Sequence, residues 1–299
     1  MQWTILGTSC MVPTKERNVA GHFLKFKGEG ILFDCGEGTQ RQMNICGIKR
    51  TDVTKVCITH WHGDHCSGLI GLIQTIGDED HPPTIEIIGP ATTKERIFHM
   101  LKSCSFTQNV KLKIQEVDPQ GVETVIDEEE YIIQAANLKH SVPCLGYAFI
   151  EKDRKNIDVD KLKRLGIRTG PHLAHLKEGK EFTWQGKKIK PEDLVITTPG
   201  IKIAYITDTR PVQTAVELAS QADILVSEAV YTSDLQKNAE HFKHMTAKEA
   251  AQLASRAGVK KLVLSHFSQR FKNTQALEEE ARTVFNNVVC ANDFMRMNF

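Results

Sequence analysis

The sequence predicts an α/β fold in which two β-sheets pack face to face and helices cover their outer sides. Short apolar runs bounded by turn residues recur from the N-terminus and are typical of strands. Segments with apolar residues at helical spacing lie between these runs, and the second half of the chain repeats the alternation. Two strand-rich halves with intervening helices therefore indicate a sheet sandwich.

The expected elements follow in chain order. The first half contains apolar runs that predict strands at residues 3–9, 22–28, 30–36, 55–60 and 84–90, and helical spacing at 67–77 and 93–104. The second half predicts strands at 202–209, 224–230 and 261–268, and helices at 212–222 and 246–258. In the last of these helices, Thr246 and Glu249 have the spacing of a capping box, and Gly258 is a typical C-terminal stop.

Length and composition restrict the class of protein. The chain has 299 residues, 40% of them hydrophobic, which predicts one large domain or a domain with an insertion. No charged-plus-apolar leader and no apolar run of about 18 residues is visible, which argues against secretion and membrane spanning. The eight cysteines are scattered without a CxxC pair, so we interpret them as reduced thiols of a cytoplasmic protein.

Positive charge is concentrated in one segment. Residues 151–190 hold 12 lysines and arginines against 6 acidic residues, a net charge of +6, whereas the whole chain has +1. The segment also interrupts the alternation of strands and helices, with one short helical stretch and few apolar clusters. We expect it to project from the main domain, either as a functional arm or as a solvated surface insertion.

A dense group of possible metal ligands follows the strand expected at 55–60. The stretch "ITHWHGDHCSGL" places His60, His62, Asp64 and His65 within six positions. Imidazole and carboxylate are ligands that zinc accepts, at about 2.0–2.2 Å each. These four side chains, joined by further ligands from elsewhere in the chain, would be more than one metal ion can use.

Three more candidates occur after apolar runs further along the chain, namely His140, Asp208 and His266. Any one of them alone is more often a structural histidine or a turn aspartate than a ligand. Together with the first cluster they give five histidines and two aspartates, which is enough for two metal ions that share a carboxylate.

These residues resemble the metallo-β-lactamase superfamily. Within it, the segments "PTKERN", "LFDCGEGTQRQ", "HMT" and "SHFSQRF", with the Gly170-Pro171 turn in a basic insertion, resemble the short form of ribonuclease Z, the transfer-RNA 3′-processing endoribonuclease. The resemblance implies a four-layer αβ/βα sandwich over residues 1–299, with a flexible arm inserted at 151–190. It also implies two zinc ions per chain, with manganese or iron as alternatives, and a homodimer.

The resemblance further assigns the site residues. His60, His62 and His140 would bind one metal ion, Asp64, His65 and His266 the other, and Asp208 would bridge them. Asp64 would also orient or deprotonate the attacking water. Asp34 would accept a hydrogen bond from a metal-binding imidazole, unless it is simply a turn-forming residue before Gly36.

Other matched residues would act on the substrate. His244 would donate a proton to the leaving group, and Glu228 would orient the His244 ring. The alternatives are that His244 is an ordinary surface histidine and Glu228 an ordinary glutamate at the end of a strand. The PxKxRN loop would contact RNA near the cut, as would the SQRF segment, through Pro13, Lys15, Arg17, Asn18 and Arg270. The arm would bind phosphates of the transfer-RNA elbow through Lys161, Lys163, Arg164, Arg168, Lys187 and Lys188.

The predicted activity is hydrolytic removal of the 3′ trailer of precursor transfer RNA after the discriminator base, leaving a 3′-hydroxyl and a 5′-phosphate. The nearest alternative is a small-ester, lactone or phosphodiester hydrolase of the same fold, which would not require the basic arm or "PTKERN". A nucleic-acid-binding protein with structural metals is a second alternative, but structural zinc sites are usually rich in cysteine.

Overall fold

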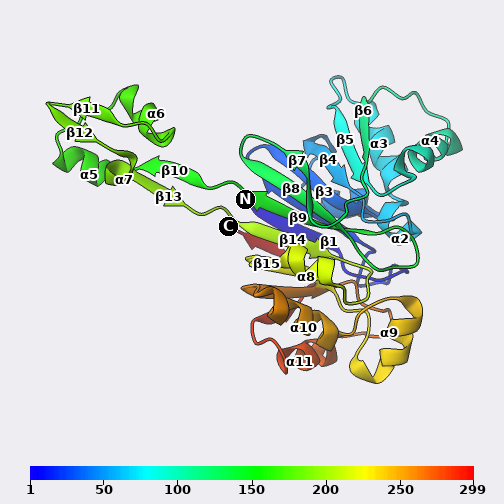
Figure 1. Cartoon of the computed structure of the whole chain (residues 1–299). Coiled ribbons are helices and arrows are strands. Elements are labelled where there is room, and N and C mark those ends of the chain that lie inside the picture. The colour runs from blue at the N-terminus through cyan, green and yellow to red at the C-terminus, as the bar shows by residue number, and fades with distance from the viewer. The chain divides into compact units, whose positions relative to one another are not determined.

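The computed structural model describes residues 1–299 and contains two seven-stranded sheets (Figure 1). The first sheet has the strand order β18-β1-β2-β3-β4-β5-β6. Strands β3 to β6 run parallel, whereas β18, β1, β2 and β3 are joined by antiparallel pairing. The bounds are β1 Gln2–Gly7, β2 Gly21–Phe26, β3 Glu29–Cys35, β4 Val53–Cys57, β5 Ile85–Gly89, β6 Leu112–Glu116 and β18 Arg296–Asn298.

The second sheet has the order β17-β16-β15-β14-β9-β8-β7. Strands β14 to β17 are parallel. The bounds are β7 Glu123–Asp127, β8 Tyr131–Asn137, β9 Leu145–Glu151, β14 Lys202–Ile206, β15 Ile224–Glu228, β16 Lys261–Ser265 and β17 Val288–Cys290.

Helices cover the outer faces of both sheets (Figure 1). On the first sheet they are α1 Thr39–Ile45, α2 Gly63–Cys66, α3 Leu69–Gly77 and α4 Thr93–Ser103, and on the second α8 Gln213–Ala219, α10 Ala247–Ala257 and α11 Gln275–Arg282. Helix α9 Gln236–Phe242 precedes α10. Each helical layer shares a separate apolar core with its sheet, which gives the four layers expected from the sequence.

Aromatic side chains join the inner faces of the two sheets. Phe33 of the first sheet stacks on Trp3 at 4.9 Å and meets Tyr205 and Tyr147 of the second sheet at 6.0 and 6.2 Å between ring centroids. All four rings are almost fully buried. The Tyr147 hydroxyl donates to the carbonyl of Ile58 over 2.8 Å, so the polar end of this ring has a partner.

The fold class expected from the sequence is confirmed, and so are the capping box of α10 and its stop at Gly258. Several of the expected strands end earlier in the structure than the sequence predicted. Residues 58–60, 207–209 and 266–268 leave the sheets, since β4, β14 and β16 end at Cys57, Ile206 and Ser265. The short strands near the C-terminus and strands β6 to β9 were not expected.

The arm segment forms most of a second compact unit, which comprises Ile150–Ile201 together with Glu128–Ile132. It contains β10 Arg154–Ile157, α5 Val159–Arg164, α6 His172–Lys177, β11 Phe182–Trp184, β12 Lys187–Ile189, α7 Pro191–Leu194 and β13 Val195–Thr198. The expectation of one helical stretch was wrong, because the unit contains three helices, α5, α6 and α7. Its few buried apolar residues form one small core of Leu162, Ile167, Leu176, Ile189 and Leu194. No helix in the chain has the length and apolarity needed to cross a membrane.

Candidate active site

The candidate metal ligands gather where strands of both sheets end. His60 follows β4, Asp208 follows β14 and His266 follows β16, while Asp64 and His65 lie in the short helix α2. The carboxyl ends of parallel strands meet at one edge of a sheet, so side chains far apart in sequence come together there. All seven candidate ligands predicted from the sequence are brought to this edge.

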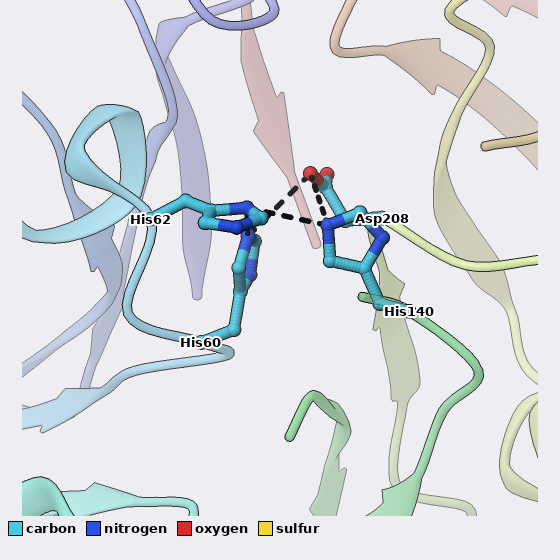
Figure 2. A group of neighbouring side chains, drawn as sticks. All are labelled: His60, His62, His140 and Asp208. Carbon is cyan, nitrogen blue, oxygen red and sulfur yellow. Dashed lines mark hydrogen bonds and ion pairs between the residues drawn. The ribbon is translucent and has the colours of Figure 1, made fainter. Parts of the chain in front are cut away.

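The first group consists of His60, His62, His140 and Asp208, whose possible ligand atoms all lie within 4.8 Å of one another. Nδ1 of His62 is 3.0 Å from Nε2 of His60 and 3.2 Å from Nε2 of His140. Oδ2 of Asp208 is 3.5 Å from His60 Nε2 and 3.8 Å from His140 Nε2. Figure 2 shows the three rings and the carboxylate turned toward a common point.

The second group shares Asp208 with the first. Nε2 of His266 is 3.0 Å from Oδ1 of Asp208 and 3.8 Å from Oδ2 of Asp64. Nε2 of His65 is 3.5 Å from Oδ2 of Asp64 and 3.6 Å from Oδ2 of Asp208. The Asp208 carboxylate therefore faces both groups.

The chemistry of these side chains fits divalent cations. Nε2 of His65 is buried without a hydrogen-bond partner, and Nε2 of His266 is buried with only the Asp208 carboxylate beside it, at 3.0 Å and without hydrogen-bond alignment; a metal ion would satisfy both nitrogens. Burial lowers the pKa of His60 and His140, which keeps these rings in the neutral form that binds metals. Burial alone would raise the pKa of Asp208, but His266 and His65 outweigh it and hold that pKa well below its usual value.

Two of the rings are oriented by hydrogen bonds on their far side. Nδ1 of His65 donates to Oδ2 of Asp34 over 2.8 Å, and Nδ1 of His140 donates to the carbonyl of Lys243 over 3.2 Å. Both bonds leave Nε2 free to face the site. Asp34 also accepts the backbone N–H of Thr59 at 2.8 Å and the hydroxyl of Tyr205 at 3.0 Å.

His244 and Glu228 form a buried pair beside the first group. Nδ1 of His244 is 3.3 Å from Oε2 of Glu228 and 4.0 Å from Oδ2 of Asp208. The Glu228 carboxylate accepts backbone N–H groups of Thr209 at 2.6 Å and Met245 at 3.0 Å, which fix its position. Burial would lower the pKa of His244, but Glu228 and then Asp208 outweigh it and raise the pKa to about 9.

Two residues that sequence reasoning missed hold this region together. Arg210 donates to the carbonyl of His244 over 2.5 Å and forms a two-pronged ion pair with Glu249, the capping-box residue of α10. Lys243 has a left-handed backbone, with φ of 57°, and its Nζ donates to the carbonyl of His140 over 3.3 Å. Only the position of Arg210, two residues after Asp208, could have drawn attention to it.

A cleft of about 1010 Å³ opens over the site. Cys10, Met11, Asp64, His244 and Arg270 are among the residues that line it. The Arg270 guanidinium lies 5.2 Å from the ring centre of Tyr231, another lining residue. An open cleft of this size above a polar site can admit a large substrate.

Two residues of the PxKxRN loop are exposed to solvent, and two make contacts within the protein. Pro13 and Lys15 are exposed. Arg17 donates to the carbonyl of Phe271 and lies 5.6 Å from the ring centre of Phe267, so its guanidinium supports the segment after His266. Asn18 donates its side-chain amide to the carbonyl of Glu37 over 2.7 Å.

The second unit presents basic side chains to solvent. Lys161, Lys163, Arg164 and Arg168 are exposed, and Gly170 and Pro171 lie just before α6. Lys187 is exposed too, whereas the likewise exposed Lys188 pairs with Glu181 at 2.7 Å. The candidate arm cations are therefore largely available for a polyanion.

Comparisons with known proteins identify relatives over the whole chain. The sequence is 39% identical over 298 residues to "Ribonuclease Z" of Thermobifida fusca, covering 98% of this chain and 93% of that protein. It is 39% identical over 297 residues to "Ribonuclease Z" of Methanothermobacter thermautotrophicus, covering 99% and 95%.

Structural comparison gives the same result. The crystal structure of the short form of human tRNase Z superposes with a TM-score of 0.75 and 27% identity, covering 100% of this chain and 99% of that one. The metallo-β-lactamase fold protein YhfI from Bacillus subtilis, at 18% identity and a TM-score of 0.70 over 99% of each chain, shares the fold.

Family models match both halves of the chain. The "Beta-lactamase superfamily domain" matches residues 172–267, and "Anti-Pycsar protein Apyc1" matches residues 1–141. Each covers less than half of the chain, whereas the relatives described above cover nearly all of it. With its two-sheet sandwich, its clustered histidines and aspartates and these full-length relatives, the chain belongs to the ribonuclease Z family and has the metallo-β-lactamase fold.

Proposed function

We propose that this protein is a metal-dependent endoribonuclease that removes the 3′ trailer of precursor transfer RNA by hydrolysis after the discriminator base. The observation that carries the proposal is the grouping of seven candidate histidine and aspartate ligands, with Asp208 between the two groups, beside the buried His244 and Glu228. In a chain 39% identical to proteins named ribonuclease Z, this set supplies what phosphodiester hydrolysis needs.

The same grouping supports two metal ions. His60, His62 and His140 would hold one ion, Asp64, His65 and His266 the other, and Asp208 would bind both. Imidazole and carboxylate ligands favour zinc, with manganese or iron as alternatives. When bound, such ions activate water for attack and neutralise charge on the phosphate.

The remaining chemistry belongs to the protein's own groups. The Asp64 carboxylate would orient the attacking water and accept its proton, since Asp64 lies at the cleft. The His244 imidazolium would donate a proton to the departing 3′-oxygen, and Glu228 would hold that imidazolium in place. The exposed Lys15 would contact RNA phosphates, while Arg17 would act through the support it gives to Phe271.

The inserted unit would bind the transfer-RNA elbow. Its segment Ile150–Ile201 carries 12 lysines and arginines against 8 acidic residues, and it has its own small core. Exposed lysines and arginines bind RNA phosphates strongly, and these contacts do not depend on the base sequence. We also propose that residues 1–299 form one catalytic domain with this insertion, and that the protein acts in the cytoplasm as a homodimer.

The decisive experiment is incubation of the purified, metal-loaded protein with a precursor transfer RNA that carries a 3′ extension. We expect one cut after the discriminator base, with a 3′-hydroxyl on the transfer RNA and a 5′-phosphate on the trailer. A 2′,3′-cyclic phosphate would contradict attack by water. An intact precursor together with rapid hydrolysis of small esters or lactones would favour the alternative hydrolase.

A further inference from the structure

Cys10 lies beside the second group of candidate metal ligands. Its backbone N–H donates to the carbonyl of Phe267 over 2.9 Å, next to His266 in the chain. The backbone N–H of the following residue, Met11, donates to Oδ2 of Asp64 over 2.7 Å. Met11 has a left-handed backbone, with φ of 66°, so a sharp turn between β1 and β2 keeps Cys10 against both ligands.

The Cys10 sulfur has the geometry of an additional ligand. Its Sγ, a carboxylate oxygen of Asp64 and a ring nitrogen of His266 all lie within 4.8 Å of one another. The Cys10 thiol makes no hydrogen bond, whereas the Cys66 thiol donates to the carbonyl of His62 and the Cys290 thiol to that of Thr274. Cys10 also lines the cleft above the site.

A separate observation indicates that a cation belongs at this position. His266 is 4% exposed and His65 is fully buried, yet Nε2 of neither ring has a hydrogen-bond partner. Both nitrogens lie within 4 Å of Oδ2 of Asp64. Buried donors or acceptors without partners are rare, and these two lie between the carboxylate of Asp64, which Cys10 adjoins, and the carboxylate of Asp208.

We propose that the Cys10 thiolate is a ligand of the metal ion held by Asp64, His65 and His266. This inference rests on the metal centre of the proposed function and goes beyond the all-histidine and aspartate set. As the sulfur bonds to the metal, the thiol proton is released to solvent. A zinc–sulfur bond of about 2.3 Å is compatible with ligand atoms grouped as closely as these.

The sulfur would make the metal position at Asp64, His65 and His266 a softer set of ligands than the position at His60, His62 and His140. Thiolate ligands favour zinc, cobalt and cadmium over manganese, which prefers oxygen. The protein should therefore hold zinc more firmly at the Asp64 position than the same protein with serine at residue 10. Replacing Cys10 should lower the zinc affinity of that position by about 10–100-fold or more. Loss of a side chain that only hydrogen-bonds to a metal ligand already costs that much, and Cys10 would bind the metal itself.

Cobalt(II) substitution tests the proposal without measuring activity. The metal-free full-length protein is loaded with cobalt(II), bound cobalt per chain is measured, and the near-ultraviolet absorption is recorded. We expect two cobalt ions per chain and a thiolate-to-cobalt charge-transfer band. The band should disappear in Cys10→Ser and Cys10→Ala and persist in the matched control Cys290→Ser, whose thiol lies away from the site.

The outcomes separate this inference from the metal centre itself. Two cobalt ions per chain without the band in the unaltered protein would overturn the role of Cys10 alone, and no variant is needed for that result. A band that survives in Cys10→Ser would do the same. If the unaltered protein binds no cobalt, the proposed metal centre fails and the inference fails with it.

Discussion

Replacing Glu228 by glutamine should lower the pKa of His244 while keeping the shape of the side chain at residue 228. Glu228 is 1% exposed, and its carboxylate lies 3.3 Å from Nδ1 of His244. It is the first contributor that raises the pKa of His244, which reaches about 9 against an ordinary 6.5. That difference corresponds to about 3 kcal/mol in favour of the imidazolium.

The expected loss depends on pH in a defined direction. A proton donor acts in its protonated form, so activity is lost as the pH rises through its pKa. With a pKa of about 9, His244 is almost fully protonated at pH 7.5, but with 6.5 only about a tenth would be. Glu228→Gln should therefore lower kcat about 10-fold at pH 7.5 and only about 2-fold at pH 6.5.

The assay is single-turnover cleavage of precursor transfer RNA between pH 6 and 9.5, with metal content measured at each pH. Asp223→Asn is a matched control, because Asp223 precedes the same strand and binds Lys202 and Lys260 away from the site. A phosphodiester with a p-nitrophenolate leaving group needs no proton donor, so Glu228→Gln should hydrolyse it at a nearly normal rate.

Two results would refute this reasoning. One is an alkaline limb of the pH profile at the same pH in Glu228→Gln and the unaltered protein. The other is an equal loss on the activated diester, which would mean that Glu228 acts on the metal centre. The glutamine also disturbs the bonds from Thr209 and Met245, so a loss of about 1–3 kcal/mol in stability should be checked by urea unfolding.

Three further predictions concern other parts of the site. His244→Ala should reduce turnover of precursor transfer RNA by about 10²–10⁴-fold with full metal content, and unchanged turnover would remove His244 from the mechanism. Asp208→Ala should bind fewer than two metals per chain by elemental analysis, because Asp208 faces both groups; two tightly held metals would contradict its bridging role. Replacing residues 158–194 by a short Gly/Ser linker between the paired Ile157 and Val195 should spare hydrolysis of the activated diester but weaken RNA binding. The slope of the logarithm of the RNA-binding constant against the logarithm of the salt concentration should become shallower by about 0.7–0.9 for each lost phosphate contact. Normal processing of precursor transfer RNA by this folded variant would refute the arm's role.

The sequence predicted most of the strands in which local pattern and burial agree, with the exception of β9, which is buried almost throughout and was not expected. Strands β3, β4 and β14 to β16 are buried almost throughout, and such strands appear as continuous apolar runs. Strands β17 and β18 have three residues each, too few to show a pattern. Because β18 pairs with β1 from the opposite end of the chain, its register depends on a partner that local sequence does not reveal.

The site was predictable where its chemistry is local. His60, His62, Asp64 and His65 stand close in sequence with metal-ligand spacing, so their side chains could be recognised together. The contacts of Arg210 and Lys243 were not predictable, because they bind the backbone carbonyls of His244 and His140. A carbonyl is present at every residue, so only the folded structure reveals which ones are used.

The backbone at two candidate ligands explains why two of the strand ends were misplaced. Asp208 and His266, which directly follow or come shortly after the last residues of β14 and β16, have left-handed backbones, with φ of 42° and 57°. Such a conformation costs a residue other than glycine about 1–3 kcal/mol, although aspartate and histidine tolerate it better than most. Glycine would adopt it freely but carries no ligand atom. The chain must turn out of the sheet at the positions where a carboxylate or an imidazole is needed, so the strain is retained and offset by the buried sheets that hold these turns.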